Sequence, residues 1–141
     1  MPSLRDLDRD RCLALITRGT IGRIAVTAPD GPHIVPVNYA LVDETIAIRT
    51  TAYSVVGTYA RGSVVAFEVD HLEHETRAAW SVMVRGRCFV EADPQMLARL
   101  RSELADSWAG GSRTLYLRVP LEHVSGRAVG GAVSARRSDV R

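Results

Sequence analysis

The sequence contains no lysine, so all 18 of its basic residues are arginines, against 16 aspartates and glutamates in 141 residues. The formal net charge of +2 is too small to indicate binding to nucleic acid. Cysteine is scarce too: Cys12 and Cys88 make neither a disulfide framework nor a Cys-x-x-Cys pair. Both cysteines fall on apolar faces of the expected elements, so we expect them in the core and not as reactive thiols.

Long hydrophobic runs are absent. No apolar stretch approaches the ~18 residues that a membrane helix requires. The first ten residues are polar and lack the apolar segment of a signal peptide. Together with the low cysteine content, these absences predict a cytoplasmic protein that does not associate with a membrane.

The motifs of several enzyme classes are also missing. The chain has no Walker-type loop, no Gly-x-Gly-x-x-Gly turn and no Gly-x-Ser-x-Gly elbow, which argues against nucleoside triphosphate hydrolases, Rossmann enzymes and serine hydrolases. His71 and His74 lie three residues apart beside two glutamates, but no third metal anchor accompanies them. We therefore expect residues 71–77 to form a solvated loop and no metal site.

What the chain does contain is the composition of one globular domain, with 46% hydrophobic and 24% charged residues. We expect residues 1–141 to form a single domain, with 126–141 as a flexible tail. From residue 20 onward apolar and polar residues alternate, which indicates strands. The expected strands are residues 20–26, 33–41, 45–50, 63–70, 79–91 and 113–119; the expected helices are residues 8–18 and 94–108, with a third, short helix within 51–62.

Six mostly antiparallel strands with two or three short helices predict a mainly β fold, a small six-stranded antiparallel β-barrel. Two residues indicate irregular positions in it. Pro36 cannot donate a ladder hydrogen bond and requires an edge or a bulge. Gly86, in the middle of the longest strand, is typical of a corner of a barrel.

A polar segment follows the third expected strand. It offers the cation of Arg49 and the hydroxyls of Thr50, Thr51 and Ser54 where a strand leads into the expected short helix. Guanidinium, hydroxyl and backbone N–H groups all donate hydrogen bonds to anionic oxygens. From the local residues, this segment is either a phosphate-binding cradle or an ordinary polar turn.

Five short stretches, in order along the chain, carry a resemblance to a known family. They are Gly-Arg-Ile-Ala-Val at 22–26, Pro-Val-Asn-Tyr at 36–39, Ile-Arg-Thr at 48–50 with Ser54, Val-Ala-Phe-Glu-Val-Asp at 65–70 and Trp-Ser-Val-Met-Val-Arg-Gly at 80–86. On these the chain resembles the pyridoxamine 5′-phosphate oxidase-like superfamily of flavin-binding split barrels. It is most similar to the short actinobacterial branch that includes nitroimidazole-resistance-type flavoproteins. The resemblance spans about residues 8–127.

The resemblance implies an FMN held at the interface of a homodimer, with its phosphate near the third strand and the following turn. On that mapping, contacts to the phosphate or ribityl chain come from Arg49, Thr50 and Ser54. The isoalloxazine would be flanked by Val37, Asn38 and Ile48, whose backbone groups would bond to its polar edge.

Two further positions complete this mapping. Trp80, on the fifth strand, would either lie near the flavin, from the same subunit or from its partner, or be a core residue at the mouth of the barrel. The wider family tends to place a lysine or arginine directly after the serine of the turn, whereas Val55 and Val56 follow Ser54 here. One cation of the expected phosphate cradle is therefore missing.

The function implied by the resemblance is an oxidoreductase that reduces a small organic substrate by hydride transfer from reduced flavin. No residue stands out as a general acid or base, so no catalytic side chain is predicted. Two alternatives remain open: a reductase that depends on the deazaflavin coenzyme, and a non-catalytic protein that binds flavin or haem.

Overall fold

The computed structural model describes residues 3–104 and 114–130. Within these ranges the strands form one antiparallel sheet in the order β1-β9-β6-β5-β2-β3-β4-β8-β7. The strands are β1 (Leu4–Leu7), β2 (Ile21–Ala28), β3 (Gly31–Val42), β4 (Thr45–Thr51), β5 (Val64–Glu73), β6 (Ala78–Arg87), β7 (Phe89–Val90), β8 (Thr114–Pro120) and β9 (His123–Val129). The helices are α1 (Arg9–Ile16), α2 (Val55–Tyr59) and α3 (Pro94–Glu103).

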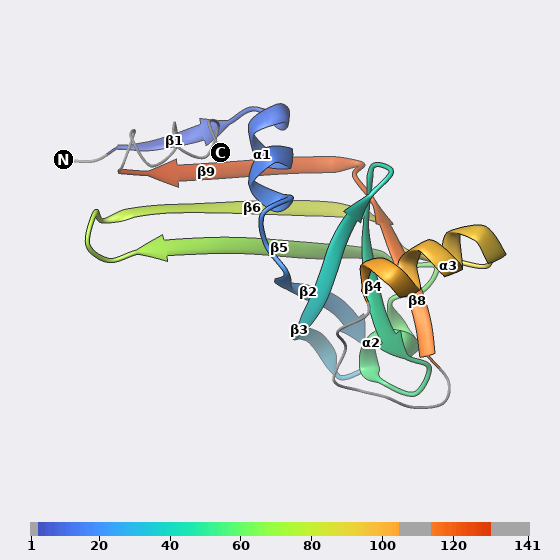
Figure 1. Cartoon of the computed structure of the whole chain (residues 1–141). Coiled ribbons are helices and arrows are strands. Elements are labelled where there is room, and N and C mark those ends of the chain that lie inside the picture. The colour runs from blue at the N-terminus through green and yellow to red at the C-terminus, as the bar shows by residue number, and fades with distance from the viewer. Residues whose placement is uncertain (1–2, 105–113, 131–141) are drawn as a thin grey trace.

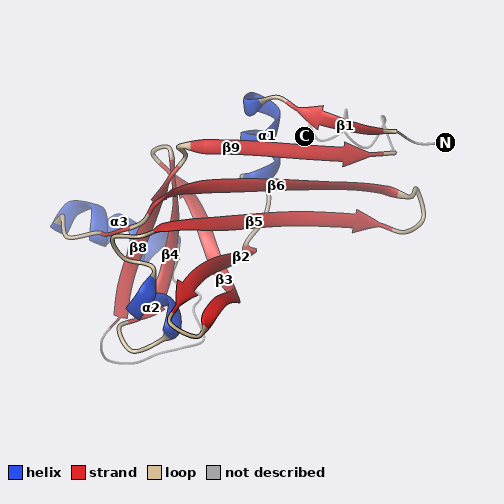
Figure 2. Cartoon of the chain, turned by 180° about the vertical axis from the view of Figure 1, so that it is seen from behind, coloured by secondary structure: helices blue, strands red, loops and turns tan. Residues whose placement is uncertain are grey.

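The sheet has two parts that point in different directions (Figure 1). Strands β9, β6 and β5 run side by side as a long flat ribbon with β1 along its edge, and α1 crosses this ribbon. Strands β2, β3, β4 and β8 turn away from it and carry α2 and α3, as the view from behind also shows (Figure 2). We call β1, β9, β6, β5 and α1 the ribbon half, and β2, β3, β4, β8, α2 and α3 the barrel half.

The main hydrophobic core lies between the two halves and includes both cysteines. Cys12 on α1 is 0% exposed and Cys88 is 1% exposed, among inward residues of β2, β4, β5, β6 and β8. Burial raises the pKa of the Cys88 thiol to about 12, and it also raises the pKa of Cys12. The near-complete burial of both side chains confirms the prediction that the cysteines are core residues. A thiol that is so hard to ionise is also a poor nucleophile.

A second, smaller core lies under α3. Asp93 caps this helix by accepting a hydrogen bond from the Met96 backbone N–H at 2.9 Å, and Pro94 stands at its start. Leu100 and Leu104 pack there on Val42, Ala47 and Tyr116. Residues 105–108 of the expected helix lie outside the described residues.

The prediction of a mainly β fold is confirmed, but the described residues hold nine strands and not six. The six expected strands correspond to β2, β3, β4, β5, β6 and β8. Strand β1 was not expected because it has only four residues, which show no usable period. Strand β9 was not expected because Ser125, Gly126 and Arg127 read as a frayed segment, whereas β1 and β6 pair with it on both sides.

Two further expectations need correction along the ribbon. Residues 126–129 of the predicted flexible tail belong to β9, while 131–141 lie outside the described residues. The predicted loop at 71–77 is shorter, because β5 continues to Glu73 and pairs there with Ala78 of β6. Continuous cross-strand pairing, which the local polar composition does not reveal, keeps His71 in a strand.

The two irregular positions behave as expected. Pro36 pairs with Arg23 of β2, and β4 pairs with β3 only from Tyr39 onward, so the proline has a partner strand on one side only. The predicted strand at 79–91 breaks soon after Gly86: β6 pairs with β5 and β9, whereas β7 pairs with β8. A Cβ on Gly86 would lie 2.2 Å from the Pro120 carbonyl oxygen, so this corner requires glycine.

One buried ion pair ties the barrel half together. The Arg118 guanidinium, on β8, donates to Glu91 Oε1 at 2.6 Å, to Thr45 Oγ1 at 2.8 Å and to the Val42 carbonyl at 3.1 Å. The Arg118 side chain is 7% exposed and that of Glu91 11%. Every contact joins residues at least 27 positions apart in sequence, so the network fixes β8 relative to the β3–β4 turn and to the residues after β7. Among the described helices, none is long and apolar enough to cross a membrane.

Candidate functional site

The candidate site begins where β3 and β4 separate. The last paired residues of these strands are Tyr39 and Ile48. Before Tyr39, β3 pairs with β2; after Ile48, β4 continues against β8 up to Thr51. We call this opening the fork. Val37 and Asn38 lie on its β3 side and Arg49 and Thr50 on its β4 side, so the fold places four of the predicted site residues at one opening.

Side chains on the two faces of the fork differ, because successive residues of a strand point to opposite faces. Ile48 belongs to the main core, so Thr50 shares its face. Arg49 is paired directly with Tyr116, which belongs to the core under α3. The structure therefore places Arg49 and Thr50 on opposite faces of β4, although the sequence grouped them in one cradle.

Thr50 and Ser54 form a hydroxyl pair, with their oxygens 2.8 Å apart. Ser54 Oγ also lies 2.9 Å from the Thr51 carbonyl, to which it donates, and 2.9 Å from the Gly57 N–H, which donates to it. The single Ser54 proton can go to Thr51 or to Thr50. When Ser54 donates to Thr50, the Thr50 hydroxyl can donate its own hydrogen bond to an outside acceptor, such as a phosphate oxygen.

Gly57 and two valines press α2 closely against the end of β4. A Cβ on Gly57 would lie 2.0 Å from the Thr51 carbonyl oxygen, so only glycine lets the helix approach this strand. Val56 is 1% exposed and Val55 packs partly against the main core. Val55 and Val56 therefore anchor α2 to the barrel, at the positions where the family tends to have a cation.

The tyrosine beside the fork, Tyr39, is not suited to proton transfer. Tyr39 is 4% exposed and its hydroxyl donates to the Ile16 carbonyl. Burial raises the pKa of Tyr39 to about 12, so the phenol stays protonated at neutral pH. The hydroxyl and guanidinium groups beside the fork are suited to donating hydrogen bonds to an anion rather than to moving protons.

Trp80 and Ile48 lie differently from the other predicted site residues. Trp80 is the third residue of β6, near the tip of the β5–β6 hairpin, at the opposite end of the molecule from α2 (Figure 1). One chain therefore does not bring Trp80 to the fork. Ile48 is 0% exposed, so its side chain belongs to the core and only its backbone faces the fork.

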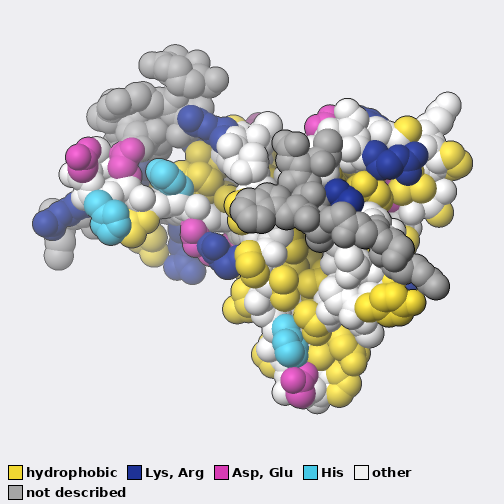
Figure 3. Space-filling model, turned by 60° about the horizontal axis from the view of Figure 1, so that its bottom comes forward, with side chains coloured by type: hydrophobic (Ala, Val, Ile, Leu, Met, Phe, Trp, Pro, Cys, Tyr) yellow, Lys and Arg dark blue, Asp and Glu magenta, His cyan; other side chains and the backbone are white. Residues whose placement is uncertain are grey.

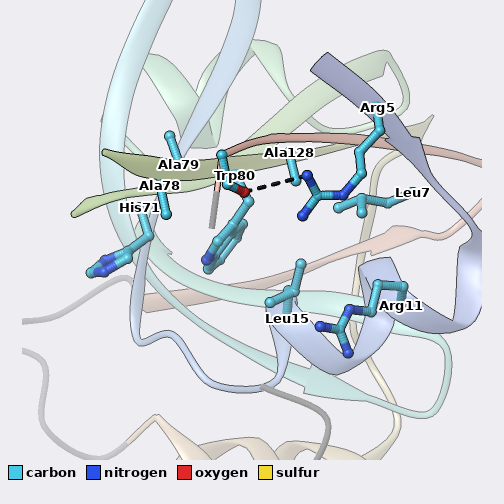
Figure 4. A pocket seen from close by; sticks show the side chains of 10 residues that line it. Arg5, Leu7, Arg11, Leu15, His71, Ala78, Ala79, Trp80 and Ala128 are labelled. Carbon is cyan, nitrogen blue, oxygen red and sulfur yellow. Dashed lines mark hydrogen bonds between the residues drawn. The ribbon is translucent and has the colours of Figure 1, made fainter. Parts of the chain in front are cut away.

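Trp80 instead lines a pocket with residues that the sequence did not single out, Arg5 on β1 and Arg11 on α1 (Figure 4). The sequence signal for them is weak, since two arginines in an arginine-rich polar N-terminus are not distinctive. Only the pairing of β1 with β9 brings Arg5 to Trp80.

Comparison with known proteins identifies the family and the fold. The family model of pyridoxamine 5′-phosphate oxidase matches residues 8–128. An uncharacterized protein of Mycobacterium tuberculosis is 32% identical over 126 residues, which cover 86% of this chain and 82% of that protein.

Solved structures give the same fold. The FAD-binding protein of Mycobacterium smegmatis is 27% identical, with a TM-score of 0.72 over 89% of this chain and 97% of that one. A FAD-binding protein of Mesorhizobium loti is 25% identical, with a TM-score of 0.77 over 92% and 99%. The chain therefore belongs to the pyridoxamine 5′-phosphate oxidase family, and its fold is the split β-barrel of that family's flavin-binding members.

Proposed function

We propose that this protein is a flavoprotein that binds FMN at the fork and reduces a small organic substrate. The observation that carries this proposal is the Thr50–Ser54 hydroxyl pair at the end of β4, where β3 leaves the strand. Family membership and the two FAD-binding relatives support a flavin as the ligand. FAD contains the same 5′-phosphate ester as FMN, so the same cradle serves either flavin.

Each residue of the fork has a distinct part in this proposal. The Thr50 hydroxyl would donate a hydrogen bond to a phosphate oxygen, with Ser54 held in place by its bonds to Gly57 and Thr51. Arg49 would approach the cofactor from the other face of β4. Val37 and Asn38 would flank the ring system, and Ile48 would contribute backbone groups only.

The flavin, when bound, supplies the hydride transfer. The chain would supply position and environment: Thr50, Ser54 and Arg49 would hold the phosphate, and Val37 and Asn38 would lie beside the ring. The high pKa of Tyr39 leaves no acidic phenol beside the ring. Protons needed by a substrate would come from solvent or from the substrate itself.

We further propose that the protein works as a homodimer. Ile21 and Ile34, on β2 and β3, are 59% and 71% exposed. Figure 3, which brings the end of the molecule with β2, β3 and α2 forward, shows hydrophobic side chains gathered over its lower lobe. Exposed apolar surface of this kind marks association, and a second copy could bring Trp80 of one subunit to the fork of the other.

The first test is the identity of the cofactor. The purified protein is expected to show flavin absorption, and denaturation is expected to release a compound with the mass of FMN or FAD. Titration with FMN, FAD and riboflavin should then show that both phosphate-bearing flavins bind more tightly than riboflavin. A deazaflavin or haem in the released fraction, or equal binding of riboflavin and FMN, would refute the proposed cradle.

The second test separates an enzyme from a binding protein. The flavin-loaded protein is reduced chemically under anaerobic conditions and offered small organic acceptors, such as quinones and nitroaromatics. Reoxidation that is faster than for the same concentration of reduced free flavin supports an oxidoreductase. A protein that binds flavin without accelerating any transfer would be a storage or sensing protein.

The third test concerns assembly. Light scattering at micromolar concentration is expected to give the mass of two chains, and Ile34→Glu is expected to give the mass of one. Ser102→Glu, exposed on α3 and away from this hairpin, serves as a matched control for the added charge. A single-chain mass for the unmodified protein would contradict the homodimer.

A further inference from the structure

A row of four residues crosses the ribbon half near its tip. Arg5 on β1 is paired with Ala128 on β9, Ala128 with Trp80 on β6, and Trp80 with His71 on β5. Residues in direct register share a face of the sheet. Because Ala128 is the smallest of the four, the row leaves a gap between the Arg5 guanidinium and the Trp80 ring.

Helix α1 closes this gap from above. Arg11 and Leu15 are four residues apart and so lie on one side of the helix. Figure 4 shows the side chains of Arg5, Arg11, Leu15 and Trp80 converging on one pocket. The pocket encloses about 20 Å³, room for one small chemical group, and it opens to solvent.

The lining of the pocket combines positive charge with apolar surface. Its remaining walls include Leu7, Ala78 and Ala79, and Ala78 and Ala128 are 6% and 5% exposed. Apolar walls strengthen the attraction between a guanidinium and an anion, because they lower the local dielectric constant. Arg5 donates to the Gly130 carbonyl at 3.3 Å, a bond that uses one of the five N–H donors of a guanidinium.

Acidic residues beside the pocket limit the charge of its ligand. Asp6, Asp8 and Asp10 line a neighbouring hollow that also touches Arg11. Asp8 caps α1 by accepting from the Arg11 backbone N–H at 2.8 Å, and Asp6 points to the face of β1 opposite Arg5. These carboxylates repel a dianion more strongly than a monoanion, which favours a carboxylate over a phosphate.

We propose that this pocket binds the carboxylate of a small aromatic acid, with the carboxylate between Arg5 and Arg11 and the ring against Trp80. Guanidinium groups bind carboxylates through two parallel hydrogen bonds. The Trp80 ring, whose centroid lies 6.3 Å from that of His71, offers an aromatic surface at the pocket. Within one chain this site is separate from the fork, and its lining residues do not include those of the fork.

The test uses benzoate as the probe and benzamide as its neutral analogue, with the full-length protein and calorimetry or ligand-observed NMR. Benzoate is expected to bind at least about tenfold more tightly than benzamide, the effect of one charged hydrogen bond. Arg5→Gln and Arg11→Gln should each lower the affinity for benzoate about tenfold or more. Arg101→Gln, on the exposed side of α3, removes the same charge elsewhere and should change nothing.

Further variants keep the test decisive if Arg11→Gln is poorly folded. Ala128→Val fills the gap without changing charge and should abolish benzoate binding, while Trp80→Ala should weaken benzoate but leave acetate unchanged. Equal affinity for benzoate and benzamide would overturn the proposal, as would benzoate binding that survives Arg5→Gln and Ala128→Val. Inorganic phosphate that binds more tightly than benzoate would overturn the carboxylate assignment.

Discussion

The hydroxyl pair at the fork comes from residues four apart in the chain, whereas the pocket at the other end of the molecule draws on five elements, β1, α1, β5, β6 and β9. Thr50 and Ser54 meet because β4 runs directly into α2. Arg5, Ala128 and Trp80 meet only because β1 and β6 pair with β9. The fork is thus a local structure that the barrel supports, and the pocket is a product of pairing between the two ends of the described chain.

The two halves also differ in how they use charge. In the barrel half, the Arg118–Glu91 pair is buried, with side chains 7% and 11% exposed. In the ribbon half, Glu68 and Asp70 bind Arg23 of the adjoining β2 at 2.9 and 2.7 Å, but all three side chains are 38% exposed or more. Removing one partner of a buried pair leaves an uncompensated charge, whereas exposed pairs contribute little. The stability of the barrel half should therefore be more sensitive than that of the ribbon half to the removal of an ion-pair partner.

The largest effect is expected for Glu91→Gln, which leaves the Arg118 guanidinium buried without its carboxylate. The free energy of unfolding at neutral pH should fall by about 3 kcal/mol. Burial alone would raise the pKa of Glu91, but hydrogen bonds from the Asp93 backbone, from Arg118 and from the Ala92 backbone outweigh it and hold the pKa below its usual value. Urea denaturation at several pH values measures both effects.

The pH dependence of this variant has a definite sign. Because the folded-state pKa of Glu91 is lowered, its stabilisation is fully present above the unfolded value of about 4.3. It is lost as the pH falls through the folded pKa. The difference between the parent and Glu91→Gln should therefore be constant near neutral pH and shrink in acid. A stability difference between the parent and Glu91→Gln that is independent of pH would contradict the ion pair between Glu91 and Arg118.

Gly57→Ala should have the next largest effect, because its Cβ would lie 2.0 Å from the Thr51 carbonyl oxygen. Moving α2 away from β4 should cost about 2–3 kcal/mol, as overpacking does in other cores. It should also separate Thr50 from Ser54 and weaken flavin binding. Thr58→Ala, one position on and exposed, should change stability by no more than about 0.5 kcal/mol. Thermal denaturation of both variants makes this comparison.

The hydroxyl pair and Arg49 can be separated by flavin titration. Thr50→Val should reduce the free energy of FMN binding by about 1.5–3 kcal/mol, the contribution of a hydrogen bond to a charged group. Arg49→Ala should weaken FMN binding within the same range, because Arg49 would contact the phosphate from the other face of β4. Neither change should affect riboflavin, which lacks the phosphate, and fluorescence quenching measures all four affinities.

Two controls sharpen this experiment. Thr27→Val, on exposed β2 surface, and Arg61→Ala, after α2, remove the same groups away from the fork and should leave FMN affinity unchanged. If Arg49→Ala weakens FMN and riboflavin equally, Arg49 does not bind the phosphate. Val55→Lys would add the missing cation, but Val55 packs partly against the core, so any gain in FMN affinity should come with a loss of stability.

The smallest effect is expected for Arg23→Gln. Its two salt bridges are short, but solvent screens them, and exposed pairs contribute roughly 0–1 kcal/mol. We therefore expect urea denaturation to show a loss of at most about 1 kcal/mol, which high salt should reduce further. A loss as large as that of Glu91→Gln would mean that the two halves do not differ in the way proposed above.

Much of this fold was predictable from local pattern. Alternation identified the six strands from β2 to β6 and β8, because each has one face in the core. The turn at Asp43 and Glu44 was predictable as well, and both residues have positive φ angles of 46° and 62°. What could not be predicted were β1 and β9, whose pairing depends on partners more than 100 residues apart in sequence.

The sequence by itself determined the strand alternation, the helix caps at Asp8 and Asp93, the buried cysteines and the segment from Thr50 to Ser54, because each of these depends on near neighbours. Tertiary structure alone decided that Arg49 and Thr50 occupy opposite faces, that Ile48 is hidden and that Trp80 lies far from the fork. It also brought Arg5 and Arg11 to Trp80. The physical reason is that register and strand order are set by the whole sheet, through burial and cross-strand pairing, and no local window of sequence contains that information.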